Sequence, residues 1–145
     1  MSDALVLERV VVKPGRLSIL VRVAPGVSRE TNEVLAAHVR RHYPALPHHT
    51  CVNGEACVFG PVMARTSIAH LLEHLIIDEQ VADPRTPRGI ALLGTTEWLD
   101  ERAGLARVEV NFSDDLVALQ ALRTALAFLN KGLEGHSHEY GASHI

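Results

Sequence analysis

The sequence predicts one α+β domain, in which two pairs of antiparallel strands form a sheet and three helices pack mainly on one face of it. Three observations predict this fold. The length of 145 residues is typical of a single domain. Segments rich in β-branched residues occur in two pairs, each joined by a short connection. Three stretches with apolar residues at helical spacing lie between or after these pairs, in the order ββα–αββα.

The first part of the chain predicts a hairpin and a helix. Residues 4–12 and 16–23 flank the sequence Lys-Pro-Gly, which favours a tight turn between two strands. Ser28 can cap a helix that extends to about residue 42 and ends before Pro44.

The middle of the chain predicts a second helix and a second strand pair. Thr66 or Ser67 begins the helix, which runs to about Gln80 and is followed by prolines. Residues 89–99 and 105–112 have the composition of two further strands.

A third helix follows the second strand pair. Ser113 provides a capping hydroxyl, and two aspartates follow it at the positive end of the helix dipole. Leucines from Leu119 to Leu129 keep the spacing of a buried stripe, and Lys131-Gly132 favours the end of the helix. The domain is thus expected to span residues 1–132, before a flexible tail, residues 133–145, that contains His136, His138 and His144.

The composition argues against several classes of function. The chain is 47% hydrophobic and 21% charged, with a net charge of −3 and no basic cluster, so nucleic acid is not an expected partner. No apolar run approaches the roughly 20 residues that span a bilayer, and Asp3 and Glu8 interrupt any signal peptide. Two cysteines do not form a disulfide scaffold, which favours a cytoplasmic protein with reduced thiols.

The segment IAHLLEHLII, residues 68–77, places three ionisable side chains on an apolar helix. At about 100° per residue, His70, Glu73 and His74 share one arc of about 100°. Histidines four residues apart can bind one ion at about 2 Å. Burying such groups together is costly unless something pairs them, and a divalent cation does so directly.

The order H-x-x-E-H is the inverse of the zincin motif H-E-x-x-H. Glu73 lies to one side of the two histidines, where its carboxylate can deprotonate a metal-bound water. With Zn²⁺ or another divalent metal, this arrangement predicts hydrolysis of an amide or similar bond, with Glu73 as the base. The alternative is a pair of core histidines that hydrogen-bond to backbone carbonyls.

A tight zinc site needs a third protein ligand. We favour Glu97, at the centre of the strand that follows the motif helix, and expect the neighbouring Trp98 to point to the opposite face of the sheet. Asp78 lies one turn after His74, and we expect it to contact a ligand side chain rather than the ion itself. The other candidates for the third ligand are Glu109, Asp78 itself, Cys51, Cys57 and His49.

The stretch YPALPHHTCVNGEACVFGPVMARTSIAHLLEHLIIDEQ resembles the N-terminal domain of cyanophycin synthetases. That family shows a Leu–His–x–Cys segment, a threonine at a helix start and an H-x-x-E-H run ending in glutamine. The matching residues are Leu46, His49, Cys51, Thr66, His70, Glu73, His74 and Gln80. The later stretch GTTEWLDERAGLARVEVNFSDDLVALQALRTAL is similar to the end of that domain, so the likeness covers roughly residues 40–130.

The resemblance implies a metallohydrolase-like fold similar to that of S-ribosylhomocysteinase and of the half-domain of insulysin and the mitochondrial processing peptidase. It implies His70 and His74 as zinc ligands, Glu73 as the base and Glu97 as the third ligand. It also implies that His49, Cys51 and Thr66 shape the site. The implied substrate is a peptide or peptide-like amide, such as the Asp–Arg polymer cyanophycin. ATP-dependent synthesis is not implied, because the chain has no P-loop motif.

Two other functions fit the same sequence. A non-catalytic binding or scaffold domain would keep the fold with a structural metal or none. A lyase of the S-ribosylhomocysteinase kind would act on a small metabolite and would use Cys51 or Cys57 as its third ligand. In the larger peptidases this domain type supplies half of a two-lobed chamber, so a homo-oligomer is expected, with a peptide or polymer substrate and no membrane partner.

Overall fold

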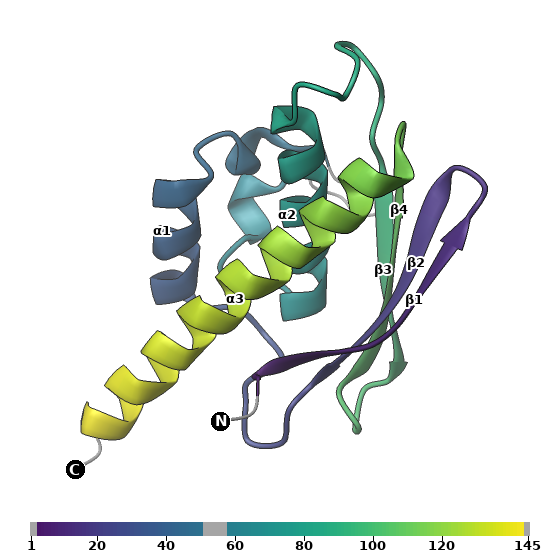
Figure 1. The fold of residues 1–145 in the computed structure, drawn as a ribbon. Coiled ribbons are helices and arrows are strands. Elements are labelled where there is room, and N and C mark those ends of the chain that lie inside the picture. Colours follow the sequence, from purple (N-terminus) through teal and green to yellow (C-terminus); the bar gives the residue numbers. More distant parts are fainter. Residues whose placement is uncertain (1–2, 51–57, 144–145) are drawn as a thin grey trace.

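The computed structural model describes residues 3–50 and 58–143, with the side chains of the last helix up to Glu134, and shows the predicted α+β fold (Figure 1). Four antiparallel strands form one sheet in the order β1-β2-β4-β3, and the helices lie on one side of it. The strands are β1 (Leu5–Lys13), β2 (Arg16–Val23), β3 (Gly94–Asp100) and β4 (Leu105–Asn111). The helices are α1 (Glu33–His42), α2 (Ile68–Ala82) and α3 (Asp115–Ser143), with short 3-10 helices η1 (Leu46–His48) and η2 (Gly60–Val62).

The core lies between the sheet and the helices. Alternate residues of β2 and β4 are buried on the helix side, as expected for strands with one covered face. Helices α2 and α3 pack on this face and against each other. Every residue of α2 from Leu71 to Ile77 is buried, which is the pattern of a helix enclosed on all sides.

Helix α1 begins later than predicted. Its cap is Asn32, whose Oδ1 accepts a hydrogen bond from Leu35 N at 2.8 Å, so the expected cap at Ser28 was wrong. The preceding residues are extended beside the start of α2, where Thr31 N donates to the Thr66 carbonyl at 2.8 Å. This pairing occupies the backbone that would otherwise have continued the helix toward Ser28.

Both ends of α3 also differ from the prediction. Asp114 rather than Ser113 is the cap, since its Oδ1 accepts from two backbone amides of the first turn at 2.9 and 3.3 Å. The helix continues past Gly132 to Ser143, within the segment expected to be a tail. A Cβ on Gly132 would lie 3.3 Å from His38 Cδ2, so this glycine allows α1 to approach closely. No helix in the described residues is both long and apolar enough to cross a bilayer.

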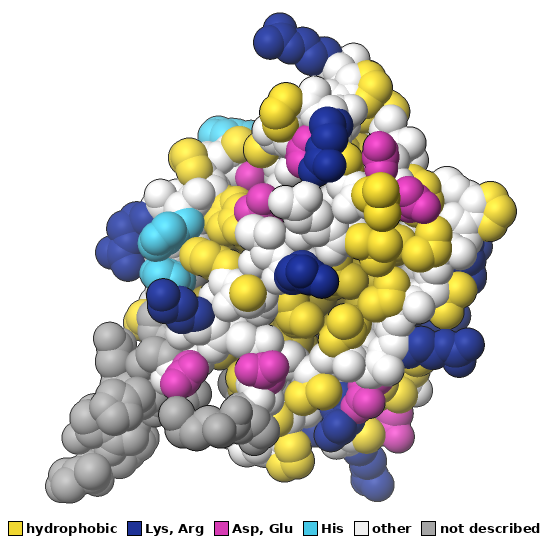
Figure 2. All heavy atoms as spheres, viewed as in Figure 1, with side chains coloured by type: hydrophobic (Ala, Val, Ile, Leu, Met, Phe, Trp, Pro, Cys, Tyr) yellow, Lys and Arg dark blue, Asp and Glu magenta, His cyan; other side chains and the backbone are white. Residues whose placement is uncertain are grey.

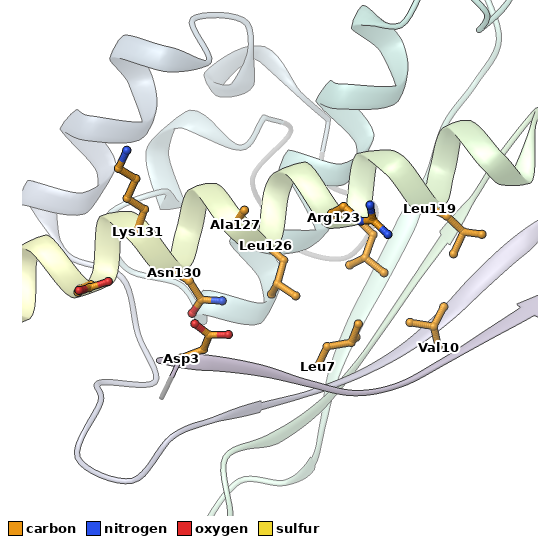
Figure 3. Close-up of a pocket in the computed structure, with 11 residues that line it drawn as sticks. Asp3, Leu7, Val10, Leu119, Arg123, Leu126, Ala127, Asn130 and Lys131 are labelled. Carbon is orange, nitrogen blue, oxygen red and sulfur yellow. The ribbon is translucent and has the colours of Figure 1, made fainter. Parts of the chain in front are cut away.

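A groove of about 670 Å³ lies where α3 crosses the outer strand β1 (Figure 3). Leu7 and Val10 of β1 face Leu119 and Leu126 of α3 across it. Hydrophobic side chains gather on this face of the molecule (Figure 2). The leucine stripe of α3 therefore has two roles, because Leu119, Leu122 and Leu126 line the groove, whereas Leu129 is fully buried in the core.

One side chain of α3 holds the start of β1. Asn130 Oδ1 accepts from Leu5 N at 2.8 Å, and Asn130 Nδ2 donates to the Leu5 carbonyl at 3.0 Å. The amide thus satisfies both backbone polar groups of a residue that is fully buried.

Replacing Asn130 with alanine should lower the free energy of unfolding by about 1–3 kcal/mol, because both Leu5 groups lose their partner in the core. Urea unfolding would measure the change. Lys131→Ala, an exposed neighbour on the same helix, is the control and should stay within about 0.5 kcal/mol of the wild type. Equal midpoints for the two variants would contradict the assignment.

Candidate metal centre

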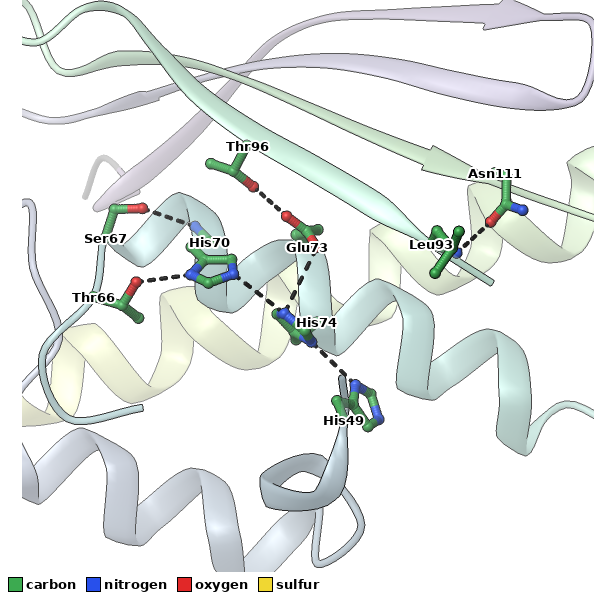
Figure 4. A network of polar contacts seen from close by, with 9 residues as sticks. All are labelled: His49, Thr66, Ser67, His70, Glu73, His74, Leu93, Thr96 and Asn111. Atoms are coloured by element: carbon green, nitrogen blue, oxygen red, sulfur yellow. Dashed lines mark hydrogen bonds and ion pairs between the residues drawn. The ribbon is translucent and has the colours of Figure 1, made fainter. Parts of the chain in front are cut away.

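The start of α2 positions the first histidine. Ser67 is the N-cap, and its Oγ accepts from His70 N at 3.0 Å. The predicted start of the motif helix at Thr66 or Ser67 is therefore confirmed. His74 follows one turn later, on the side of α2 that faces β3 and the chain around His49 (Figure 4).

The two imidazoles point one nitrogen each at a common position. His70 Nε2 and His74 Nε2 are 3.2 Å apart, and the ring planes are inclined by 65°. Two nitrogens at about 2.0–2.1 Å from a tetrahedral zinc ion would be separated by about 3.3 Å. The side chains as they stand therefore fit a shared ion. His74 is only 1% exposed, whereas His70 is half-buried and forms the more open side of the pair.

Glu73 completes the group from the sheet side. Its Oε2 lies 3.6 Å from His74 Nε2, and its Oε1 accepts a hydrogen bond from Thr96 Oγ1 at 2.7 Å. Ligand atoms of His70, Glu73 and His74 all lie within 4.8 Å of one another. Within the described ranges, these three residues form the one group of this kind that could hold a metal ion.

Burial sets the protonation of these three side chains. It raises the pKa of the Glu73 carboxyl to about 7, although the Thr96 hydrogen bond and positive charge at His49 act in the opposite direction. Burial lowers the pKa of His70 and, together with positive charge at His70 and His49, lowers the pKa of His74 to about 3. Both histidines are therefore neutral at physiological pH, which is the form that binds a metal.

The sheet makes room for Glu73 through a glycine. A Cβ on Gly94 would lie 2.7 Å from Glu73 Cγ and 2.9 Å from the carbonyl oxygen of Glu109. Gly94 and Thr96 are two residues apart on β3 and therefore share the face toward α2. Gly94 provides the space for the Glu73 carboxylate, and Thr96 provides its hydrogen-bond donor.

A second set of side chains lies behind the imidazoles. Thr66 Oγ1 is 2.8 Å from His70 Nδ1, and His49 Nδ1 is 3.2 Å from His74 Nδ1. His49 Nε2 in turn lies 3.0 Å from Asp78 Oδ1. The predicted supporting positions of Thr66, His49 and Asp78 are therefore all at the site, and Asp78 acts through His49 rather than directly on a ligand.

Phe59 covers the pair of histidines. Its ring stacks on His74 with centroids 3.9 Å apart and meets His70 edge-on at 5.0 Å. Phe59 is fully buried and its backbone N donates to the His49 carbonyl at 2.7 Å. This contact ties the aromatic cover to the residue that supports His74.

The structure does not bring Glu97 to the site, so the choice of Glu97 as third ligand is wrong. Strand β3 begins at Gly94 rather than near residue 89, and its alternation turns Thr96 toward α2 and Glu97 to the outer face. Glu97 is largely exposed there and pairs with Arg107 at 3.5 Å. Trp98 packs against the core, on the opposite face from Glu97 as expected.

The remaining candidates do not complete the ligand set. Glu109 lies on the outer face of the sheet, where it contacts Lys13 at 3.4 Å. Cys51 and Cys57 lie outside the described residues, as does His144. For His136 and His138 the structure describes the backbone only, within α3.

Sequence reasoning missed three residues of the site, Gly94, Thr96 and Phe59. The spacing of Gly94 and Thr96 on one strand face was a usable signal, but it required knowing which face meets α2. Comparison with protein-family models, with curated proteins and with solved structures found no match to this chain. The resemblance to the cyanophycin synthetase domain therefore stays a prediction that rests on the motif residues.

Gly94→Ala should destabilise the protein by about 1–3 kcal/mol, because the added methyl group would overlap Glu73 Cγ and the Glu109 carbonyl oxygen. Chemical unfolding would measure this. Thr95→Ala, the adjacent position on the exposed face, is the matched control and should cost much less. A Gly94→Ala variant as stable as the control would contradict the close packing of β3 on Glu73.

The raised pKa of Glu73 predicts a pH-dependent stability of the metal-free protein. Between pH 4.5 and about 7 the folded carboxyl keeps a proton that the unfolded chain has lost, so the free energy of unfolding falls as the pH rises. Glu73→Gln removes this titration. Relative to the wild type, the variant should gain stability across that range, by up to about 3 kcal/mol. Parallel stability–pH curves for the two proteins would show that Glu73 is not a protonated buried acid.

Proposed function

We propose that this chain is a zinc-dependent hydrolase that cleaves a peptide or peptide-like amide bond. The observation that carries the proposal is the pair of neutral histidines with Nε2 atoms 3.2 Å apart, next to a buried carboxylate. Two histidine ligands and a base are thus supplied within a single helix turn.

The protein residues have separate tasks in this proposal. His70 and His74 would hold the ion through their Nε2 atoms, and Thr66, His49 and Phe59 fix the two ring orientations. Zinc bound there would polarise the substrate carbonyl and lower the pKa of water. Glu73, with a pKa of about 7, can take up a proton near neutral pH and return it to the leaving amine.

Thr96 keeps the base in place. Its hydroxyl donates to Glu73 Oε1, so the other carboxylate oxygen remains directed toward the histidine pair (Figure 4). The donated bond also stabilises the ionised form of Glu73 against the effect of burial. The strand and the helix therefore determine jointly which oxygen acts as base.

A second candidate is a domain that holds a metal without catalysis. The burial of Glu73 and His74, which are 4% and 1% exposed, favours it, because a closed site is typical of structural zinc. The half-buried His70 favours catalysis, since it leaves one side of the group open to solvent. Retention of metal without hydrolysis of any peptide would decide for the second candidate.

The test combines metal analysis with activity. Protein purified without added metal should contain about one zinc per chain, as expected for a single site. Glu73→Gln should retain the zinc and lose hydrolysis by about 10²–10⁴-fold, since only the base is removed. His74→Ala should lose both. Activity would be followed on a mixed peptide library and on the Asp–Arg polymer.

Glu97→Gln is the matched control for Glu73→Gln. The two carboxylates undergo the same chemical change, but Glu97 lies on the outer face of the sheet beside Arg107. Its variant should keep both zinc content and hydrolysis. Metal-free wild-type protein, or a Glu73→Gln variant that hydrolyses at the wild-type rate, would overturn the proposed function.

A further inference from the structure

The groove between α3 and β1 continues as exposed apolar surface toward the start of α3. Within the groove, Leu7 and Val10 of β1 face leucines of α3 (Figure 3). Leu116 lies one turn before Leu119 and is 67% exposed, more than any other large hydrophobic side chain of the described residues. Val12, near the end of β1, is 46% exposed. Apolar surface that extends over two neighbouring elements is typical of an interaction site.

The same side of the molecule carries an open edge of the sheet. Strand β1 pairs with β2, and no other strand of the described residues pairs with it. Asn130 occupies the backbone groups of Leu5 at the start of this edge. A partner that covers the groove would also cover the rest of the edge, which is otherwise exposed to unspecific strand pairing.

Three residues along this side of α3 have a self-complementary order of charge. Asp115, Leu119 and Arg123 are four residues apart, so their side chains form one ridge along the helix. Asp115 and Arg123 are exposed, and no ion pair among the side chains of residues 3–50 and 58–134 includes either of them. The ridge thus has the order acid, leucine, base. Two such ridges complement each other when they run antiparallel.

We propose that the occupant of the groove is a second copy of this chain, and that the two α3 helices pack antiparallel about a two-fold axis at Leu119. Asp115 of each copy then faces the partner's Arg123, so the symmetry makes the ion pair twice. Leu119 of both copies meets at the axis, and Leu116 packs on the methylene groups of the partner's Arg123. Ridges of residues four apart pack in the commonest class of helix contact, at a crossing angle of about −50°.

The charges on this side of α3 favour a second copy over another partner. A partner with one sign of charge would neutralise either Asp115 or Arg123 and would repel the other. A copy neutralises both residues and also covers the leucines between them. The ridge from Asp115 to Arg123 is only about 12 Å long. We therefore expect a weak dimer that dissociates on dilution.

The proposed dimer contact lies away from the candidate metal centre. Strands β1 and β3 are the opposite edges of the sheet, and Glu73 lies against Gly94 and Thr96 of β3. The two metal centres of the dimer would therefore not face each other across one chamber. The inference does not rest on the proposed function, and its test needs neither zinc nor hydrolysis.

Sedimentation equilibrium of the full chain over a wide range of concentrations tests the dimer. The wild type should show a reversible monomer–dimer equilibrium. Arg123→Asp should raise the dissociation constant at least about 10-fold, because it sets two acids against each other at both ends of the contact. Lys131→Asp makes the same change of charge at the other end of the groove, beyond the ridge, and should have much less effect.

Mixing two variants tests the pairing of Asp115 with Arg123 directly. Asp115→Arg should fail to self-associate for the same reason as Arg123→Asp. An equimolar mixture of the two variants should form a 1:1 heterodimer, because each copy then carries the charges that the other lacks. The double variant Asp115→Arg/Arg123→Asp should dimerise about as well as the wild type. A purely structural role of either residue would not produce this rescue, and circular dichroism would confirm that each variant is folded.

A third variant tests the apolar part of the contact. Leu116→Glu should abolish the dimer, because it places an acid beside the ion pair and removes the leucine. Val34→Glu is the control, since Val34 of α1 is 47% exposed but lies outside the groove. A wild type that stays monomeric at every concentration would overturn the inference and leave a different protein as the occupant. Variants that mix without forming a heterodimer, or a dimer that Leu116→Glu leaves intact, would also overturn it.

Discussion

The central constraint on this structure is that α2 is buried on all sides and yet carries three ionisable side chains. A buried polar atom without a partner costs far more than a made hydrogen bond returns, so each group needs a partner inside the core. Thr96 of β3 donates a hydrogen bond to Glu73, and the Thr66 hydroxyl contacts the His70 ring. The ring of His49, which follows η1, contacts the ring of His74. Because these partners come from separate segments, the core can close around α2 only in the arrangement that also builds the site.

The register of β3 decides the chemistry of the site. Gly94 and Thr96 face α2, whereas Thr95 and Glu97 face outward. A shift by one residue would exchange the two sets. It would set a second carboxylate against Glu73 in the core and remove the glycine that makes room for it. The pairing of β3 with β4 from Gly94 onward therefore completes the sheet and also determines which β3 side chains face Glu73.

The sequence was informative where a feature is local. The motif helix, its start and the grouping of His70, Glu73 and His74 follow from helical spacing and were found where predicted. The fold class also followed, because strand pairs and amphipathic stretches carry their own signals. Glu97 was misplaced because the inward face of β3 depends on its pairing with β4, in which Glu97 lies opposite Arg107 on the outer face.

Competing contacts explain the other differences. Gly132 was interpreted as a helix end from its backbone freedom, but it lies within α3, where a Cβ would come within 3.3 Å of His38 Cδ2. Ser28 lost its predicted capping role because the chain after it pairs with Thr66. Asp78 was expected near the site from its helix position alone, yet its action through His49 depends on a loop that returns from before α2. Such contacts connect distant parts of the chain and leave no periodic pattern.

The Asn130 clamp on Leu5 also bears on how the protein is made. The two residues are 125 positions apart, and translation proceeds at about 5–20 residues per second, so β1 leaves the ribosome roughly 6–25 seconds before its clamp. During that interval the buried amide and carbonyl of Leu5 have no partner from α3. Until α3 has been made, pairing with β2 is therefore the contact that can order β1, and its first residue is fixed last.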